Sequence, residues 1–236
     1  MKMKPFSFKQ FDIYQDRTAM KVGTDGVLLG AYANLTRGNR ILDIGTGTGL
    51  ISLMLAQRYP QALIDAVEID EEAYNQAKDN FNQSKFKSQL AIYKTAIQDY
   101  QIDKKYDLIV SNPPFFKNNE RVDTDARKIA RQQENLSFKD LLAKVSNLLD
   151  LAGTAMFIIP HDLEDEFIQL AKDANLFPSH ILHIKGNNEA LIKRSIVTLT
   201  FNNLLDVMYN ELVIEVARHQ YTKEYIALTK DFYLKM

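Results

Sequence analysis

The segment Ser111-Asn112-Pro113-Pro114-Phe115 carries residue types that could bind a planar group bearing an –NH2. Its prolines lack N–H groups and fix φ, so the turn offers carbonyl acceptors without competing donors. Asn112 adds a side-chain acceptor, and Phe115 adds a flat apolar ring. Acceptors at Asn112 Oδ1 and the Pro113 carbonyl would hold both N–H bonds of a conjugated amine and turn its lone pair toward an electrophilic carbon. These four residues, Asn112 to Phe115, are therefore the predicted catalytic residues, acting on a base amine or a side-chain amide.

Three glycines in the sequence LDIGTGTGLI follow a predicted strand and open a predicted helix: Gly45, Gly47 and Gly49. Glycine lets the backbone approach a ligand closely, and a helix N-terminus offers unpaired N–H donors. The spacing is neither the G-x-G-x-x-G of dinucleotide folds nor a phosphate-binding P-loop. Asp43 precedes the first glycine by two residues, and an acid there suits a cationic ligand better than a pyrophosphate. S-adenosylmethionine, which has an ammonium, a sulfonium and no phosphate, is the predicted cofactor.

A second acid, Glu68, follows Gly49 by 19 residues at the predicted end of the next strand. A carboxylate at this position can accept hydrogen bonds from both hydroxyls of a ribose. The loop, the helix and this acid together predict a site for the adenosine part of the cofactor. The alternative is a glycine-rich turn with an incidental acid.

The elements that position these residues alternate between strand-like and helix-like patterns. Strands are predicted at 40–45, 62–69, 90–94, 106–110 and 154–160. Helices are predicted at 24–35, 50–58, 70–81, after Ser137, and at 162–175. HILHI and IVTLTF, on either side of a Gly-Asn-Asn turn, predict an antiparallel pair near the C-terminus.

This order of elements predicts an α/β fold with a Rossmann-like, mostly parallel sheet, a terminal antiparallel strand and helices on both faces. Ligands of such sheets bind beyond the carboxyl ends of the strands. The site is therefore expected at 43–49, 68–70, 95–99 and 111–116. Residues 1–35 are predicted to form a separate lead-in element, with a helix capped by Thr24 or Asp25, and residues 36–236 the single catalytic domain.

The composition is that of an ordinary globular protein, with 46% apolar and 25% charged residues. The absence of cysteine excludes disulfides, thiolate chemistry and cysteine-ligated metals. The four histidines show no metal-ligand spacing, so no metal is expected. No apolar run approaches the roughly 20 residues that span a bilayer, and the N-terminus lacks an apolar signal core. A cytoplasmic location without a membrane partner is therefore expected.

The net charge of −1 does not indicate a general nucleic-acid binder, but the charges are unevenly distributed. Residues 117–131 carry five bases against three acids, and a local basic field can steer a polyanion. The alternative is a solvated loop whose charges have no partner. The predicted RNA-binding residues of this segment are Lys117, Arg121, Arg127, Lys128 and Arg131.

Nearly the whole chain resembles the bacterial tRNA1(Val) adenine-37 N6-methyltransferase family, within the class I S-adenosylmethionine-dependent methyltransferases. Two segments, KVGTDG and YTKEYIALTKDFY, are the most specific to this family. The glycine loop is shared by many methyltransferases. The resemblance is carried by residues 8–33, 40–58, 64–81, 106–118 and 221–236.

The resemblance implies that the glycine loop holds the cofactor and that Asp43 and Glu68 bind its polar ends. Asn112 to Phe115 would grip the target adenine, which must be splayed out of the anticodon loop. The methionine end of the cofactor would be lined by Lys21, Gly23, Thr24 and Asp25. The other cofactor-binding residues that it implies are Thr46, Ile69, Ala96, Ile97 and Asn112.

Two positions depart from the family pattern. Many relatives carry an acid near the end of the third strand, where this chain has Ala96; backbone groups or Asp99 could serve instead. Phe115 stands where tyrosine is also common, and a stacking ring needs no hydroxyl.

The residues alone leave three other functions open. N5-methylation of a protein glutamine and N2-methylation of guanine in ribosomal RNA would use the same Asn-Pro-Pro-Phe chemistry. A nucleotide- or RNA-binding module without catalysis is disfavoured by the intact Asn112 and glycine loop. A dehydrogenase is disfavoured by the glycine spacing. The sequence does not indicate an oligomeric state.

Overall fold

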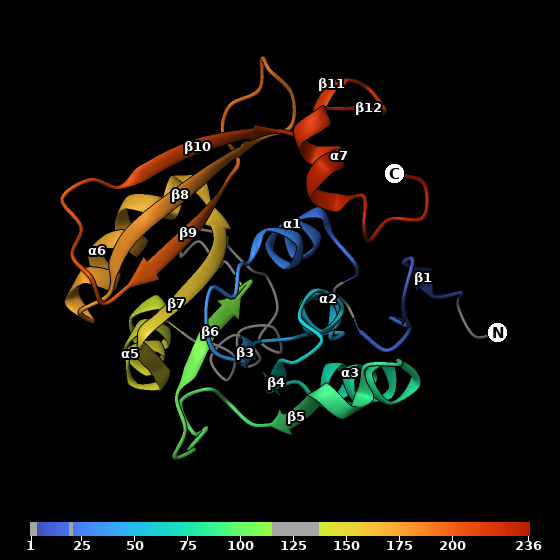
Figure 1. Ribbon diagram of the computed structural model, residues 1–236, viewed down its shortest axis with the longest axis horizontal. Coiled ribbons are helices and arrows are strands. Elements are labelled where there is room, and N and C mark those ends of the chain that lie inside the picture. Colours follow the sequence, from blue (N-terminus) through green and yellow to red (C-terminus); the bar gives the residue numbers. More distant parts are fainter. Residues whose placement is uncertain (1–3, 19–20, 115–136) are drawn as a thin grey trace, which may run out of the picture.

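The computed structural model describes residues 4–18, 21–114 and 137–236. Within them, the centre of the fold is an eight-stranded sheet with the order β10-β8-β9-β7-β6-β3-β4-β5 (Figure 1). Its strands are β3 (Arg40–Ile44), β4 (Leu63–Glu68), β5 (Leu90–Lys94), β6 (Tyr106–Ser111), β7 (Leu149–Pro160), β8 (Phe177–Lys185), β9 (Arg194–Thr200) and β10 (Met208–Val213). In this sheet β9 runs antiparallel to both neighbours, and the other pairs are parallel. The predicted α/β class, with a mostly parallel sheet and an antiparallel strand, is confirmed.

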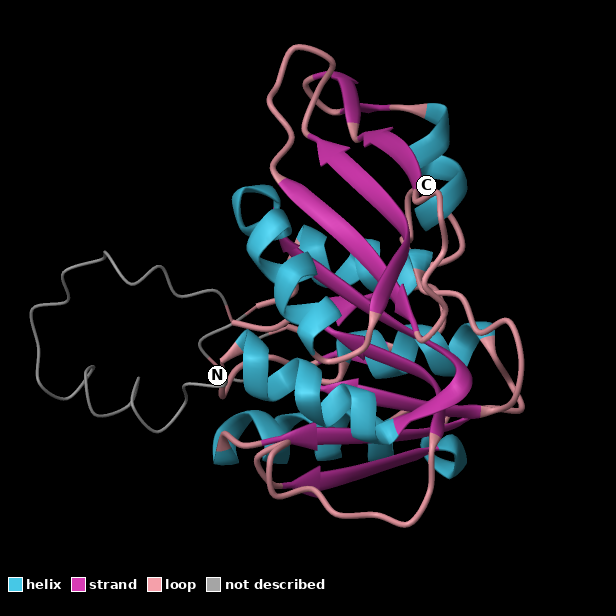
Figure 2. Cartoon of the chain, turned by 90° about the vertical axis from the view of Figure 1, so that its left-hand side faces the viewer, coloured by secondary structure: helices cyan, strands magenta, loops and turns pink. Residues whose placement is uncertain are grey.

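Helices cover both faces of the sheet, as predicted (Figure 2). They are α1 (Thr24–Tyr32), α2 (Leu50–Arg58), α3 (Glu71–Gln83), α5 (Phe138–Leu148), α6 (Glu164–Asp173) and α7 (Lys223–Thr229), with short 3-10 turns η1 (Lys87–Gln89) and η2 (His161–Leu163). Side chains of α5 and α6 share one core cluster with the sheet, whereas those of α1, α2, α3 and α7 share the clusters of the other face. Among the described residues, no helix has both the length and the apolar character needed to cross a membrane.

Strand β3 places apolar side chains on both faces of the sheet. Successive side chains of a strand point to opposite faces of the sheet. Leu42 packs with α5 and α6, and Ile41 packs with α1 and α2, and neither side chain is exposed. Burial of each such side chain contributes about 1.5–3 kcal/mol. The central strand is thus fixed on both sides, and it holds the loop that follows it at a defined edge.

Local sequence signals placed several helix boundaries correctly. Helix α2 spans the predicted residues 50–58. Helix α3 begins after Asp70, whose carboxylate accepts a hydrogen bond from the Ala73 N–H at 2.8 Å. Ser137 is the N-cap of α5, and its Oγ accepts from the Asp140 N–H at 3.1 Å. These side chains satisfy N–H groups that have no partner within the helix.

The predicted cap of the first helix is wrong. Helix α1 begins at Thr24, so its N-cap is Gly23, and no side chain caps it. Asp25 lies inside the first turn, and its Oδ2 accepts from Arg194 Nε at 2.7 Å instead. A long-range ion pair, which the local sequence does not reveal, therefore determines where this carboxylate lies.

Several short elements were not predicted. Strand β10 extends the sheet beyond β8, and two small antiparallel pairs form: β1 (Phe6–Ser7) with β2 (Asp12–Ile13), and β11 (Glu215–Ala217) with β12 (Gln220–Tyr221). Near the N-terminus, Phe8 bridges to Tyr233, and Phe8 and Ile13 are buried in one cluster with Met54 of α2. The start of the chain thus packs on α2 and on the C-terminal segment. The division of the chain at residue 35 stays a prediction.

Candidate functional site

The predicted site lies where the order of the strands reverses. Strand β3 pairs with β4 on one side and with β6 on the other. Open α/β sheets bind ligands at such switch points. Because Ile44 is level with Ser111, the glycine loop after β3 and the Asn-Pro-Pro segment after β6 leave the sheet side by side. Ser111 Oγ donates a hydrogen bond to the Ile44 carbonyl oxygen at 2.8 Å and ties the two strand ends together.

The three loop glycines all adopt the left-handed conformation, with φ of +69° at Gly45, +58° at Gly47 and +85° at Gly49. A Cβ added at Gly45 or Gly47 would meet no atom within 4 Å, whereas one at Gly49 would lie 2.4 Å from the Phe81 ring. The backbone at Gly45 and Gly47 therefore borders open space that a ligand could approach. Gly49 is needed for packing against α3.

We expect Gly49→Ala to lower the free energy of unfolding by about 2–4 kcal/mol, from the left-handed backbone and the overlap with Phe81. Gly47→Ala has only the backbone cost, about 1–2 kcal/mol, because its surroundings are open. Urea unfolding of both variants measures the difference. Equal losses of stability would contradict the distinction between a packing glycine and a ligand-facing glycine.

Asp43 fastens the glycine loop to the first turn of α2. Its side chain is fully buried, and its Oδ2 accepts from Thr46 Oγ1 at 2.6 Å, Ser52 Oγ at 2.7 Å and Ser52 N–H at 3.1 Å. Among the described residues its Oδ1 is buried without a hydrogen-bond partner. Since Asp43 has no exposed surface, we interpret it as a positioning residue for the loop; its direct contact with a cofactor stays a prediction. Sequence reasoning missed Ser52, although a lone hydroxyl in an apolar helix was a usable signal.

Burial raises the pKa of the Asp43 carboxyl to about 6, and nearby Glu68 adds to this, while the hydrogen bonds from Thr46 and Ser52 oppose it. The folded chain thus holds this proton more tightly than the unfolded chain, whose ordinary value is 3.8. The stability that the group contributes is complete below about pH 4 and is lost as pH rises through about 6.

This titration predicts a pH-dependent effect of Asp43→Asn, which keeps the shape of the side chain and removes its charge. Relative to the wild type, the variant should gain up to about 3 kcal/mol of unfolding free energy between pH 4 and pH 7. Urea unfolding of both proteins across this range measures the change. A difference that is constant with pH would contradict the raised pKa.

Glu68 joins the end of β4 to the glycine loop. Its Oε2 accepts from the Gly47 N–H at 2.8 Å, and its Oε1 accepts from the N–H groups of Ile69 and Asp70 at 2.9 and 3.0 Å. Burial raises the pKa of this carboxyl, and the three N–H groups oppose the rise. They use three of its roughly four lone-pair directions, so acceptor capacity remains mainly on Oε2. The contact with both hydroxyls of a ribose stays a prediction.

The loop after β5 completes this side of the site. Thr95 N–H donates to the Glu68 carbonyl oxygen at 3.0 Å, which places the loop beside the end of β4. Ile97 is buried, Ala96 is half-buried, and Ile69 exposes 46% of its surface directly after Glu68. The site therefore offers an apolar surface next to a carboxylate, as binding of a nucleoside would require.

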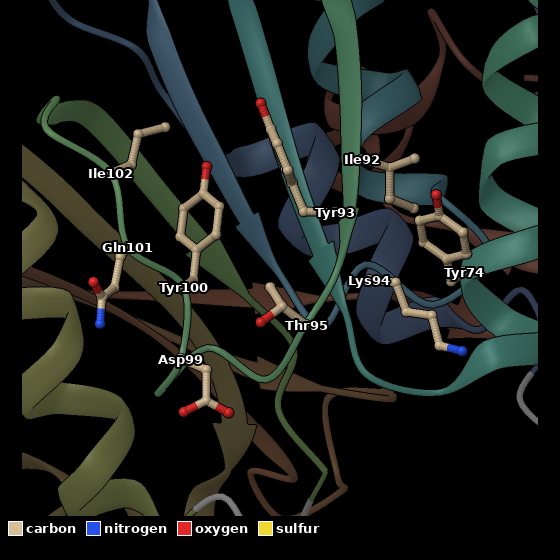
Figure 3. Close-up of a pocket in the computed structure, with 9 residues that line it drawn as sticks. All are labelled: Tyr74, Ile92, Tyr93, Lys94, Thr95, Asp99, Tyr100, Gln101 and Ile102. Atoms are coloured by element: carbon tan, nitrogen blue, oxygen red, sulfur yellow. The ribbon is translucent and has the colours of Figure 1, made fainter.

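A pocket of about 440 Å³ lies further out, along the edge strand β5 (Figure 3). Tyr93, Thr95 and Tyr100 line it, together with Asp99, the acid suggested as a substitute at the Ala96 departure. None of its lining residues belongs to the glycine loop or the Asn-Pro-Pro segment. The pocket is thus beside the candidate site, and we do not assign the cofactor to it.

The start of α1 lies at the same edge, because a Cβ on Gly26 would be 3.1 Å from Leu50 in the first turn of α2. Gly23 and Thr24 therefore lie near the glycine loop. Lys21 Nζ donates to the carbonyl oxygens of Gln15 and Thr18 at 2.5 and 2.7 Å, and Asp25 pairs with Arg194. The proposed contacts of these four residues with the methionine end of a cofactor stay predictions.

The Asn-Pro-Pro segment is only partly described. Asn112 is half-buried, Pro113 is buried and Pro114 is exposed. Asn112 follows Ser111, so it lies next to the first residue of the glycine loop. The remaining predicted residues of this region lie outside the described residues: Phe115, Lys117, Arg121, Arg127, Lys128 and Arg131.

Comparison with known proteins agrees with this geometry. The methyltransferase small domain family matches residues 19–154. A tRNA1(Val) (adenine(37)-N6)-methyltransferase from Flavobacterium psychrophilum is 47% identical over 98% of this chain and all of its own length. Proteins with the same description from Parabacteroides distasonis and Pseudoalteromonas translucida are 42% and 39% identical, over 98% and 99% of this chain and 98% and 100% of their own lengths.

Solved structures support the fold. A predicted O-methyltransferase from Agrobacterium tumefaciens superposes with a TM-score of 0.71 at 18% identity, covering 88% of this chain and 96% of its own. A ribosomal protein L11 methylase from Lactobacillus delbrueckii has a TM-score of 0.51 at 17% identity, with coverage of 74% and 76%. The sheet is therefore the Rossmann-like class I methyltransferase sheet that the sequence predicted.

Proposed function

Because this chain belongs to the tRNA1(Val) (adenine(37)-N6)-methyltransferase family, we propose that it methylates N6 of adenine 37 in the anticodon loop of a tRNA, with S-adenosylmethionine as methyl donor. The observation that carries this function is the position of the glycine loop and Asn112 on adjacent strand ends. The glycine loop would hold the methyl donor, and the Asn-Pro-Pro segment would hold the target amine. The two segments leave the sheet one strand spacing apart. A cytoplasmic location fits a tRNA substrate and is part of this proposal.

The residues present fit S-adenosylmethionine. Open space lies beside the backbone of Gly45 and Gly47, and Glu68 keeps acceptor capacity for a ribose hydroxyl. Ile69 offers an exposed apolar side chain where the adenine of the cofactor would lie. When bound, the cofactor supplies an electrophilic methyl group on its sulfonium. Further proposed contacts come from Thr46, Ala96, Ile97, Gly23 and Thr24.

Asn112 and Pro113 would prepare the target amine. The N6 lone pair of adenine is delocalised into the ring, so this nitrogen is a poor nucleophile. Asn112 Oδ1 and the Pro113 carbonyl oxygen accept hydrogen bonds from its two N–H groups and direct the lone pair out of the ring plane. The proline-rich turn keeps these acceptors in place, and Phe115 would stack on the base. No strong base is required, because the methylated ammonium loses its proton readily.

Methyl transfer into RNA tests the function. Total RNA and protein from a strain lacking the enzyme are incubated with the purified chain and tritiated S-adenosylmethionine, and the tRNA, ribosomal RNA and protein fractions are then analysed separately. Label in N6-methyladenosine is the expected result. Label only in protein, or only in N2-methylguanosine of ribosomal RNA, would favour one of the alternative acceptors, and no label would favour a binding module.

The basic segment 117–131 is proposed to contact the RNA backbone. We expect Arg127→Glu and Arg131→Glu each to weaken tRNA binding. Each should also reduce the slope of log affinity against log salt concentration by about one. Lys172→Glu is the matched control. Lys172 is exposed near the end of α6, just before β8 begins and away from the carboxyl ends of the parallel strands. The affinity of each variant for tRNA, measured at several salt concentrations, tests this contact. Unchanged binding by both arginine variants would contradict the contact.

A further inference from the structure

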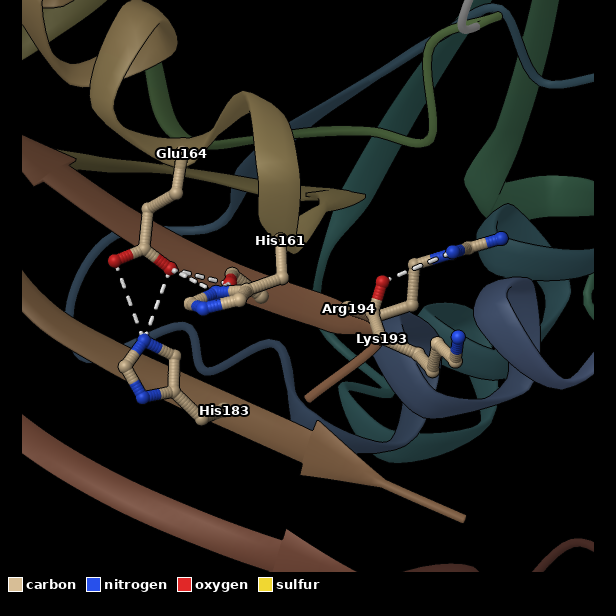
Figure 4. Close-up of polar contacts among 6 residues, drawn as sticks. His161, Glu164, His183, Lys193 and Arg194 are labelled. Atoms are coloured by element: carbon tan, nitrogen blue, oxygen red, sulfur yellow. Dashed lines mark hydrogen bonds and ion pairs between the residues drawn. The ribbon is translucent and has the colours of Figure 1, made fainter. Parts of the chain in front are cut away.

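Two histidines and a glutamate meet at the carboxyl edge of the sheet, outside the methyl-transfer site (Figure 4). His161 lies in the turn η2 after β7, Glu164 begins α6, and His183 lies near the end of β8. The sequence spacing did not suggest this cluster, because the fold brings together residues of three separate elements.

The geometry of the three side chains resembles a coordination sphere. His183 Nε2 lies 2.9 Å from Glu164 Oε2, and His161 Nδ1 lies 3.2 Å from the same oxygen. All three candidate ligand atoms lie within 4.8 Å of one another. Ligands bound at about 2.0–2.2 Å to one ion are separated by roughly 3.0–3.5 Å in tetrahedral or octahedral geometry. Small rotations of the two rings would therefore suffice to place all three around one ion.

The surroundings support a built site. Ser195, which is fully buried, donates from its Oγ to Glu164 Oε2 and so orients the carboxylate. Such outer partners are a regular feature of metal sites. The Glu164 side chain is 10% exposed, and those of His183 and His161 are 19% and 36% exposed, so the cluster is open on one side. Solvent could fill the remaining coordination positions.

We propose that His161, Glu164 and His183 bind one divalent transition-metal ion of the Zn²⁺ type. Two imidazole nitrogens and one carboxylate oxygen suit Zn²⁺ or Co²⁺, whereas Mg²⁺ and Ca²⁺ prefer oxygen ligands alone. A metal ion binds a histidine only when the coordinating ring nitrogen carries no proton. The affinity of the site for the metal therefore falls as the pH is lowered. The proposal does not depend on methyl transfer, because the cluster uses none of the residues assigned to the cofactor or the target base.

Metal binding by the tag-free chain tests this site. Equilibrium dialysis against micromolar Zn²⁺ should give one ion per wild-type chain, and Co²⁺ should give a visible absorption band of a protein-bound ion. His161→Asn and His183→Asn should each lower the affinity at least about 100-fold, and Ser195→Ala about 10–100-fold. His180→Asn is the matched control, since His180 lies on the same strand but contacts Tyr32 and Asn210 instead.

Two outcomes would overturn the site. Wild-type protein that takes up no stoichiometric Zn²⁺ and gives no bound-Co²⁺ spectrum excludes it without any variant. Binding by both His161→Asn and His183→Asn with wild-type affinity would place the ion elsewhere. Circular dichroism of each variant shows whether a loss of metal binding follows from unfolding. The Co²⁺ spectrum of the wild type shows whether the site exists, whatever the folding of the variants.

Discussion

Replacement of Asn112 by alanine is expected to lower the rate of methyl transfer by about 10²–10³-fold, the usual effect of removing one preorganised hydrogen-bonding group that acts in the transition state. The loss should fall on turnover more than on the affinity for S-adenosylmethionine, because the variant removes only one of the contacts proposed for the cofactor and leaves the glycine loop and Glu68 unchanged. Asn112 is half-buried at the end of β6, so the truncation leaves the core intact. Single-turnover methylation of tRNA measures the rate, and calorimetry with S-adenosylhomocysteine measures the affinity.

Asn203→Ala is the matched control for this variant. It makes the same chemical change at an exposed residue that follows the end of β9. Because β9 runs antiparallel to β7, this end lies away from the carboxyl ends of the parallel strands. Its turnover should equal that of the wild type. If Asn112→Ala kept turnover within about threefold of the wild type, the assignment of the amine-binding acceptor would be wrong.

Glu68→Gln is expected to weaken the binding of S-adenosylmethionine by about 10–100-fold. The wild-type carboxylate accepts three backbone N–H groups, including that of Gly47, and hydrogen bonds to a charged group contribute about 1.5–3 kcal/mol. The amide has one acceptor atom and adds an N–H that faces these donors. The variant therefore loses both a ribose acceptor and the fastening of the glycine loop to β4.

Glu72→Gln controls for the loss of a negative charge, because Glu72 is exposed in the first turn of α3, a few residues further along the chain. Isothermal titration with S-adenosylhomocysteine compares the two variants. Equal affinities of Glu68→Gln and the wild type would remove Glu68 from the cofactor site. A parallel thermal melt separates a binding defect from a folding defect.

The sequence was most informative where local physics decides the structure. Residues Ile41–Ile44 of β3 are buried on both faces, α2 is stopped by Tyr59-Pro60, and Ser137 caps its helix with its own hydroxyl. The candidate site follows from these elements, because parallel strands bring their carboxyl ends to one edge. The position of Glu68 beside the glycine loop could therefore be predicted from the order of the elements alone.

Long-range contacts account for what the sequence did not predict. Strand β10 is held by pairing with β8, and α7 packs where its Tyr225 is buried among residues of α1 and α2. Asp25 pairs with Arg194 rather than capping its own helix. The attachment of Asp43 to Ser52 depends on the close packing of β3 and α2. Such contacts are set by tertiary packing, which overrides local preference.

Methylation of two tRNA transcripts shows whether the chain modifies adenine 37. One carries adenine at position 37 of the anticodon loop, and the other carries guanine there and is otherwise identical. We expect labelled methyl groups from S-adenosylmethionine to enter the first transcript as N6-methyladenosine and the second transcript to stay unlabelled. Equal labelling of both transcripts, or no label in the transcript with adenine at position 37, would contradict this function.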